Sequence, residues 1–190
     1  MTRIGIIRHG STPWNYEGRA QGNSDIPLNK EGLADANKLA ERLVKENWDI
    51  IYSSNLLRAK QTAEIIADKT GLPLHLEPRL REVAGGLIEG TTEAERVQKW
   101  GSKWWELDLG IEKDESVIAR GLSMMEDLNV YHPNKNILIV SHGAFIKQML
   151  KVLVPHLEME ESLENTSFTT IIKTDMEWDC DLYNCIRHLT

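Results

Sequence analysis

Two copies of one short pattern lie far apart in this chain. Each is an apolar, β-branched run that stops at a histidine followed by glycine, over residues 4–10 and 137–143. Apolar runs without alternation predict strands buried on both faces, as in the parallel sheets of α/β proteins. Glycine after the strand lets the backbone turn sharply, and open α/β sheets bind ligands at the carboxyl ends of their strands. We therefore expect His9 and His142 at a ligand-binding edge, where chemistry is a better explanation for them than core packing.

Strand and helix patterns alternate along most of the sequence. Strands are expected at 3–8, 49–53, 74–76 and 137–141, and helices at about 29–46, 56–71, 115–131 and 144–153, with a loop over 10–28 and a helix-bearing insert over 90–107. Two β-rich segments, 167–173 and 177–183, flank Thr174-Asp175-Met176 and predict a hairpin at the sheet edge. We predict an α/β three-layer sandwich with a mostly parallel central sheet, helices on both faces and a C-terminal antiparallel edge hairpin. With no linker or repeat, residues 1–190 are expected to form a single domain.

Composition limits the classes of partner. The 22 Lys and Arg against 29 Asp and Glu give a net charge of −7 without a basic cluster, which argues against nucleic acid. No apolar stretch approaches the roughly 20 residues that span a bilayer, so no membrane partner is expected. Met1 leads directly into a strand without a signal-peptide layout, and the chain has two cysteines, Cys180 and Cys185. We expect free thiols and a cytoplasmic protein.

Three further charged residues stand beside predicted strand ends. Arg8 directly precedes His9, Arg58 lies in the first turn of a helix, and Glu82 opens a glycine-rich loop over 82–90. If the strands share a sheet, these residues converge with His142 at one edge. An arginine near a helix N-terminus opposes the helix dipole, so a purely superficial role for Arg58 is disfavoured.

Two arginines and two histidines around one point describe an anion site. Guanidinium groups match phosphate oxygens in pairs, and an unprotonated imidazole can attack phosphorus to form a phosphohistidine. Neighbouring guanidinium charges lower the pKa of a histidine toward that unprotonated state. The second histidine, if protonated, can donate to a phosphoryl oxygen. Glu82 can protonate the departing alkoxide, provided that its loop raises its pKa. These parts fit a two-step phosphoryl transfer without a metal.

The chain resembles the histidine phosphatase superfamily, the phosphoglycerate-mutase-like fold, and its short bacterial phosphatase branch in particular. The matching motifs are Arg8-His9-Gly10 with Thr12 and Asn15, Gln21-Gly22, Leu28-Asn29-Lys30-Glu31-Gly32, the segment 53–63, Glu82 with Glu89-Gly90, and Val140-Ser141-His142-Gly143. The resemblance implies that His9 is the nucleophile and Glu82 the proton donor. It implies that Arg8, Arg58 and His142, which clamp the phosphoryl group, are catalytic as well. It further implies a substrate-binding set of Arg8, Asn15, Gln21, Gly22, Arg58, His142 and Gly143.

The resemblance further implies a small-molecule phosphate ester as substrate, and no metal or other cofactor. It leaves monomer and homodimer open. Sugar phosphates, phosphoglycerates, phosphoserine and the phosphorylated cobalamin precursor are all compatible substrates. One departure concerns the shape of the pocket, because the family usually carries aromatic residues where this chain has Gly85 and Ile88.

Other functions fit parts of the pattern. The main alternative is a phosphoglycerate mutase, although cofactor-using mutases of this family carry an extra covering segment and only about two dozen residues separate Gly90 from Asp114 here. A metal-dependent hydrolase could use His9, His142 and Glu82 as ligands, but a cation site should not be ringed by guanidinium groups. A non-catalytic sensor of phosphorylated ligands would not need both a nucleophile and an acid.

Several individual residues also allow two interpretations. Asn15 could stabilise its own turn, and Glu89 and Glu93 compete with Glu82 for the role of acid. In the insert, the tryptophans could pack in the core or a lid, or could face the substrate: Trp100, Trp104 and Trp105. The cations of the insert share one helix face, which could be solvated or could meet a second anionic group of the substrate: Arg96, Lys99 and Lys103.

Overall fold

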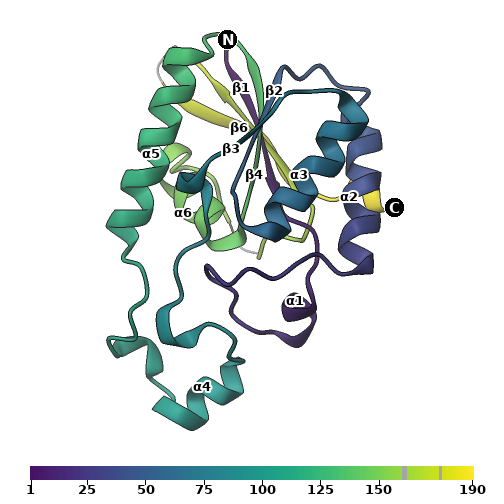
Figure 1. The fold of residues 1–190 in the computed structure, drawn as a ribbon. Coiled ribbons are helices and arrows are strands. Elements are labelled where there is room, and N and C mark those ends of the chain that lie inside the picture. Colours follow the sequence, from purple (N-terminus) through teal and green to yellow (C-terminus); the bar gives the residue numbers. More distant parts are fainter. Residues whose placement is uncertain (160–161, 176) are drawn as a thin grey trace.

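A six-stranded sheet forms the centre of the computed structural model, which describes residues 1–159, 162–175 and 177–190 (Figure 1). The strand order is β3-β2-β4-β1-β5-β6. The strands are β1 (Arg3–Arg8), β2 (Ile50–Ser53), β3 (Leu74–Leu76), β4 (Asn136–Ser141), β5 (Phe168–Lys173) and β6 (Trp178–Cys185). The first four pair in parallel, whereas β5 runs antiparallel to β1 and β6 antiparallel to β5. The predicted parallel sheet with an antiparallel edge hairpin is confirmed.

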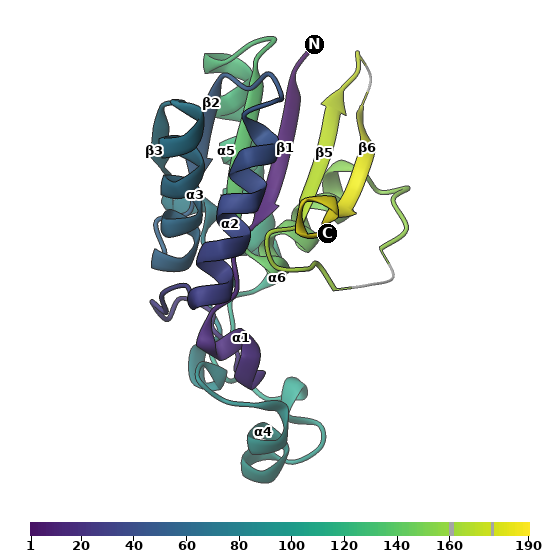
Figure 2. The same ribbon diagram turned by 90° about the vertical axis from the view of Figure 1, so that its right-hand side faces the viewer.

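Helices cover both faces of the sheet (Figures 1 and 2). On one face lie α2 (Lys30–Leu43) and α3 (Leu57–Thr70), which bury Leu39, Ala63 and Ile66 against the strands. On the other lie α5 (Asp114–Tyr131) and α6 (Gly143–Leu153), which bury a second apolar cluster. This is the predicted three-layer sandwich.

The two central strands are buried as their apolar runs predict. Ile4 and Ile6 of β1 pack into the cluster under α5 and α6, while Ile7 packs under α2 and α3. A Cβ at Gly5 would lie within 2.8 Å of the side chains of Phe168, Leu138 and Trp48, so only glycine fits there. This burial fixes the register of β1 against β4, and with it the positions of the residues that follow both strands.

The structure differs from the sequence-based predictions mainly at element ends and in loops. The expected loop over 10–28 contains a short helix, α1 (Pro13–Glu17), whose first turn is capped by Thr12 and Asn15. The helix expected to reach residue 46 ends at Leu43, and β6 extends two residues beyond the predicted strand. In the hairpin turn, Thr174 N donates to Glu177 O over 2.9 Å, and the predicted turn residue Met176 lies outside the described residues.

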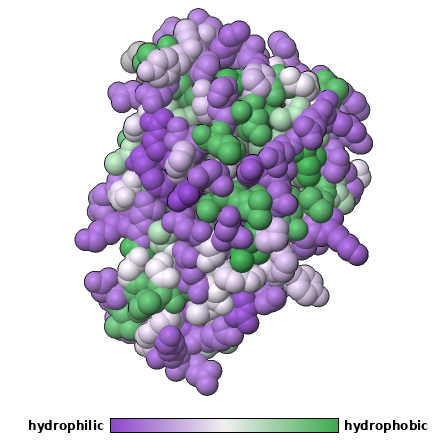
Figure 3. All heavy atoms as spheres, viewed as in Figure 1, coloured by the Kyte–Doolittle hydropathy of each residue, from purple (hydrophilic) through white to green (hydrophobic). Residues whose placement is uncertain are grey.

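The insert contains α4 (Glu93–Trp100) and a short 3-10 turn (Trp104–Glu106). It lies together with α1 beyond the edge of the sheet where β1 and β4 end (Figures 1 and 2). Backbone hydrogen bonds between Ala20 and both Gly90 and Thr91 tie the two segments together. The face shown in Figure 3 is mostly hydrophilic, with its hydrophobic residues in separate groups. None of the helices in the described part of the chain is long and apolar enough to cross a membrane, and both cysteines are free thiols.

Candidate active site

His9 and His142 meet at the carboxyl ends of β1 and β4. The parallel register pairs Arg8 with Ser141, so the residues that follow are neighbours in space. His9 N donates to Ser141 O over 3.0 Å, and the two imidazole ring centroids are 5.1 Å apart with a 54° tilt. Both side chains are buried, at 2% and 0% exposure. The placement predicted for the two histidines is confirmed.

The His9 ring has one protonated and one free nitrogen. Nδ1 lies 2.7 Å from Gly10 O, a pure acceptor, so Nδ1 carries the proton. Nε2 instead accepts a hydrogen bond of 3.3 Å from Arg58 Nε. Burial, and then the charges of Arg58 and Arg8, hold the pKa of His9 well below its usual value. At neutral pH the ring is uncharged, with a lone pair on Nε2.

Arg58 turns inward from the first turn of α3 and is completely buried. Its Nη1 donates to Ser24 O at 2.8 Å and its Nη2 to Gly22 O at 2.7 Å. Burial lowers the pKa of Arg58 to about 10, so the guanidinium remains charged at neutral pH. The interpretation of Arg58 as a surface cation is therefore wrong.

Arg8 is the last residue of β1 and is partly buried. Its Nη1 donates to Leu163 O, and its Nε has no hydrogen-bond partner among the described residues. Burial lowers the pKa of Arg8, although the charges of Glu82 and Glu164 partly oppose this effect. A Cβ at Gly143 would stand only 3.3 Å from Arg8 Nε, so the glycine at the start of α6 makes room for the guanidinium.

His142 is also uncharged at neutral pH, because burial and then the charges of Arg58, His9 and Arg8 hold its pKa well below the usual value. Its Nε2 lies 2.8 Å from Ser54 Oγ, while its Nδ1 has no partner within the described part of the chain. A neutral imidazole still carries one N–H donor. His142 can therefore donate to an anion without the protonation that the sequence analysis assumed. The contact with Ser54 was not predicted.

Glu82 joins the cluster through the N-terminus of α6. Its Oε1 accepts from Phe145 N at 2.8 Å and Val83 N at 2.9 Å, and its Oε2 accepts from Ala144 N at 3.1 Å. Its charge acts on the pKa of both Arg8 and Arg58. The structure thus brings together all five charged or titratable residues that the sequence selected.

The competing carboxylates have structural contacts instead. Glu89 accepts hydrogen bonds from Ser24 Oγ and from the backbone N–H groups of Asn23 and Gly85, at 2.6 to 2.9 Å. Burial raises the pKa of Glu89, but these hydrogen bonds outweigh it and hold that pKa below its ordinary value. Glu93 accepts from Trp104 Nε1 at 2.8 Å within the insert. A Cβ at Gly85 would lie 2.8 Å from Glu89 Cγ, which explains why no aromatic side chain stands there.

The outer residues of the predicted set form a polar layer around His9. Asn15 Oδ1 accepts from Thr12 N at 3.1 Å, so Asn15 does stabilise its own turn, and Gln21 Oε1 accepts from Thr12 Oγ1 at 2.8 Å. Asn165 Nδ2 donates to His9 O at 3.0 Å and to Asn15 Oδ1 at 3.4 Å. The sequence analysis missed Asn165, which follows no recognised motif.

The cations of the insert do not share one solvated face. Arg96 is buried, donates to Thr91 O at 2.7 Å and lies 4.8 Å above the Trp104 ring. Lys99 lies over the ring of Trp100, and Lys103 pairs with Glu106. Arg96 and Trp104 therefore stabilise the insert itself, and Trp105 is 60% exposed.

The arrangement suits an anion rather than a cation. The buried guanidinium of Arg58 and the partly buried guanidinium of Arg8 act on both imidazoles, and a cation placed among them would be repelled. Across the described ranges, no group of three or more His, Cys, Asp or Glu is placed to hold a metal ion.

Comparisons with known proteins agree with this geometry. Residues 4–186 match the family model of the histidine phosphatase superfamily (branch 1). The chain is 34% identical to phosphatase PhoE of Bacillus subtilis (strain 168), over 100% of this chain and 98% of that protein. It is 33% identical to a probable phosphoglycerate mutase, GpmB, of Yersinia pestis (strain Pestoides F), over 94% of this chain and 88% of that protein. A mycobacterial glucosyl-3-phosphoglycerate phosphatase in complex with VO3 superposes with a TM-score of 0.88 at 28% identity, covering 96% of this chain and 98% of that one.

Proposed function

This chain belongs to the histidine phosphatase superfamily, and we propose that it is a cytoplasmic enzyme that hydrolyses a small phosphorylated metabolite through a phosphohistidine on Nε2 of His9. One observation carries the proposal above the others. The unprotonated Nε2 of His9 lies beside the buried guanidinium of Arg58, at an edge that it shares with Arg8 and His142. A nucleophile surrounded by fixed positive charge is what attack on a phosphate ester requires.

In the first step, Arg8, Arg58 and His142 bind the phosphoryl oxygens and orient phosphorus toward His9. Nε2 attacks phosphorus, a P–N bond forms, and the bond from phosphorus to the ester oxygen breaks. Glu82 donates a proton to the departing alkoxide. Two backbone N–H groups bind Oε1 of Glu82 and one binds Oε2, so Oε2 keeps a lone pair that can carry the proton for this transfer.

In the second step, water attacks the phosphohistidine. The ionised Glu82 accepts a proton from the water as the P–N bond breaks, which releases phosphate and restores the lone pair on His9. The positive charges of Arg8 and Arg58 stabilise the phosphoryl group through both steps. No metal enters either step.

The mutase alternative differs only in the acceptor of the second step. The insert between Gly90 and Asp114 supports water as the acceptor, because it is short. It carries one short α-helix and a 3-10 turn over this edge of the sheet, rather than a long segment that would cover the intermediate. Incubation with 3-phosphoglycerate distinguishes the two activities. Release of inorganic phosphate is expected, and formation of 2-phosphoglycerate without phosphate release would identify a mutase.

The nucleophile can be tested by trapping. Rapid quench of the wild-type enzyme with a ³²P-labelled substrate should give a protein-bound phosphate that is acid-labile and base-stable. His9→Ala should lose this label and reduce turnover by several orders of magnitude, as removal of a covalent nucleophile typically does. His156→Ala is the matched control, because His156 is exposed and pairs with Asp179. Comparable turnover by His9→Ala would refute the mechanism.

The role of Glu82 as the acid can be tested by comparing substrates whose leaving groups differ in their need for a proton. Glu82→Gln should slow hydrolysis of alkyl phosphates by about 10²–10⁴-fold, the usual contribution of general acid catalysis. The kcat/KM for p-nitrophenyl phosphate, which reports the first step alone, should fall much less, because p-nitrophenolate leaves as a stable anion. The kcat is not compared, because it also includes the second step, in which Glu82 acts as the base. Glu89→Gln is the control carboxylate in the same loop. If the leaving-group dependence follows Glu89, the assignment of Glu82 is wrong while the phosphohistidine survives.

The same assays, extended to a panel of phosphorylated metabolites, identify the substrate. The relatives reported above carry the names of different activities, namely a phosphatase, a probable phosphoglycerate mutase and a glucosyl-3-phosphoglycerate phosphatase, so they support only the class of small phosphate esters for this chain.

A further inference from the structure

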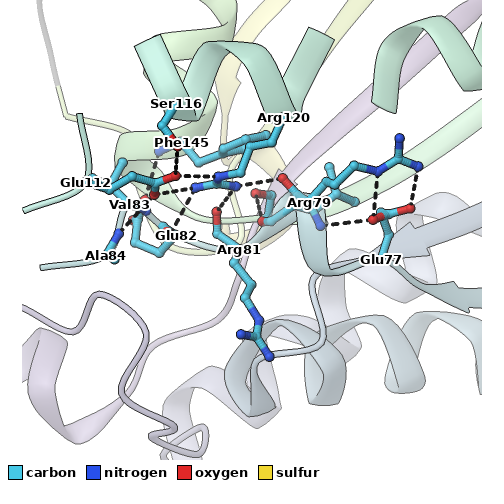
Figure 4. A network of polar contacts seen from close by, with 12 residues as sticks. Glu77, Arg79, Arg81, Glu82, Val83, Ala84, Glu112, Ser116, Arg120 and Phe145 are labelled. Carbon is cyan, nitrogen blue, oxygen red and sulfur yellow. Dashed lines mark hydrogen bonds and ion pairs between the residues drawn. The ribbon is translucent and has the colours of Figure 1, made fainter. Parts of the chain in front are cut away.

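The loop that carries Glu82 is held by one side chain from a distant helix. Arg120 of α5 donates from Nη1 to the carbonyl oxygens of Arg79 and Arg81, at 2.6 and 2.8 Å (Figure 4). Its Nη2 donates to the carbonyl oxygen of Glu82 at 3.2 Å. The guanidinium of Arg120 therefore binds the backbone carbonyl of Glu82, the proposed acid, and two carbonyl groups just before it.

Glu112 extends this attachment beyond Glu82. Arg120 Nε and Nη2 donate to the two carboxylate oxygens of Glu112, at 2.9 and 3.0 Å. Glu112 Oε2 also accepts from Ala84 N at 3.2 Å, and Glu112 N donates to Ala84 O at 2.9 Å. The loop is thus attached on both sides of Glu82, as Figure 4 shows.

Arg120 also lies over the side chain of Phe145, the residue whose backbone N–H binds the Glu82 carboxylate. Its guanidinium carbon lies 4.8 Å from the centre of the Phe145 ring, and Phe145 N donates to Glu82 Oε1. One side chain of α5 thereby connects the backbone of the acid to the start of α6. Arg81, by contrast, points away from this network and donates from Nε to Asn55 Oδ1 at 2.7 Å (Figure 4).

The guanidinium of Arg120 has no donor left for a substrate. An arginine offers five N–H donors, and the contacts above use one on Nε, two on Nη1 and two on Nη2. Arg120 is therefore suited to hold the protein rather than to bind phosphate. The loop needs such support, because residues 81–85 lie between two short 3-10 turns and form no regular element of their own.

We propose that Arg120, together with Glu112, is a positioning residue that fixes the Glu82 carboxylate for proton transfer to the leaving group. This inference rests on the proposed role of Glu82 as the acid. A general acid must lie within hydrogen-bond reach of the ester oxygen, and a displacement of about 1 Å can cost about 10²-fold in rate. Loss of Arg120 should therefore affect the step that needs the proton, and not the binding of phosphate.

The test compares Arg120→Met on two substrates. With glycerol phosphate, whose alkoxide needs protonation, kcat/KM, which reports the first step, should fall by about 10²-fold. With p-nitrophenyl phosphate kcat/KM should change by less than about threefold, and the inhibition constant of inorganic phosphate should be unchanged. In a Glu82→Gln background the substitution should cause no further loss, because residues that act as a unit are not additive. Arg120→Lys keeps the charge and the aliphatic stem but offers three donors, and should show a smaller defect of the same kind.

Arg79→Met is the matched control. Arg79 lies in the same segment and forms ion pairs with Glu77 and Asp127, so its loss also removes half-buried ionic contacts without touching Glu82. It should leave the ratio of the two activities unchanged. If Arg120→Met does not fold, the same comparison is made with Arg120→Lys.

The outcomes separate this inference from the proposed function. Equal losses of kcat/KM on both substrates, or a full further loss in the Glu82→Gln background, would mean that Arg120 only stabilises the fold. A leaving-group defect in Glu82→Gln without one in the Arg120 variants overturns the positioning role alone. If Glu82→Gln itself shows no such defect, the assignment of the acid fails and this inference falls with it.

Discussion

Removal of Arg58 should weaken anion binding by an amount that its contacts allow us to calculate. The guanidinium donates to Gly22 O, Ser24 O and His9 Nε2, which occupies three of its five N–H donors. Two donors remain for a phosphoryl oxygen, and each hydrogen bond to a charged group is worth about 1.5–3 kcal/mol. Because paired contacts are not fully additive, we expect Arg58→Met to lose about 3 kcal/mol of binding free energy, or about 100-fold in affinity.

The assay is competitive inhibition of p-nitrophenyl phosphate hydrolysis by vanadate and by inorganic phosphate. The inhibition constants of Arg58→Met should both rise about 100-fold. Thermal unfolding must be measured in parallel, since the substitution leaves the carbonyl groups of Gly22 and Ser24 without their donor and should lower Tm. Titration calorimetry with phosphate on the folded variant separates weak binding from a low fraction of folded protein.

Arg96→Met provides the matched control. Arg96 is another buried arginine that donates to a backbone carbonyl, that of Thr91, but it lies in the insert. Its loss should lower Tm without changing either inhibition constant by more than about twofold. The placement of the phosphate site would be refuted if the folded Arg58→Met protein bound vanadate with wild-type affinity, or if Arg96→Met showed the larger defect.

Three further outcomes follow from the same geometry. Because burial, Arg58 and Arg8 hold the pKa of His9 below its ordinary value, kcat/KM corrected for substrate ionisation should stay constant as pH falls through about 6.5; a loss centred there would contradict an uncharged nucleophile. Gly143→Ala should raise KM about tenfold, because its Cβ would press on Arg8 Nε, and an unchanged KM would show that Arg8 does not bind the phosphoryl group. Dialysis against EDTA should leave turnover unchanged, whereas loss of activity that Mg²⁺ or Zn²⁺ restores would favour a metal-dependent hydrolase.

Local sequence was sufficient to predict the location of residues that lie next to strand ends, because the sheet then determines where those residues lie in space. The apolar runs before His9 and His142 predict buried parallel strands, and parallel strands bring their carboxyl ends to one edge. Arg8, Arg58 and Glu82 each stand within a few residues of a strand end. Their convergence could therefore be predicted before any contact was known.

Short elements and backbone-directed contacts could not be predicted in this way. The five residues of α1 are too few to show a helical period, although Thr12-Pro13 was an available N-terminal signal. Asn15 was given two roles, and the structure shows the local one, because its Oδ1 caps α1, while phosphate binding stays a prediction. Burial makes His142 a neutral donor, and a sequence does not reveal how completely a side chain will be buried.

The sequence by itself determined the layers of the fold and which residues converge at the candidate site, because both depend on periodicity and on spacing along the chain. Only the tertiary structure decided how the site is supported. Arg120 binds carbonyl oxygens of a loop about 40 residues away in sequence, and every residue type offers the same carbonyl acceptor. Such contacts leave no pattern in the chain, since they exist only once α5 has packed beside the loop that carries Glu82.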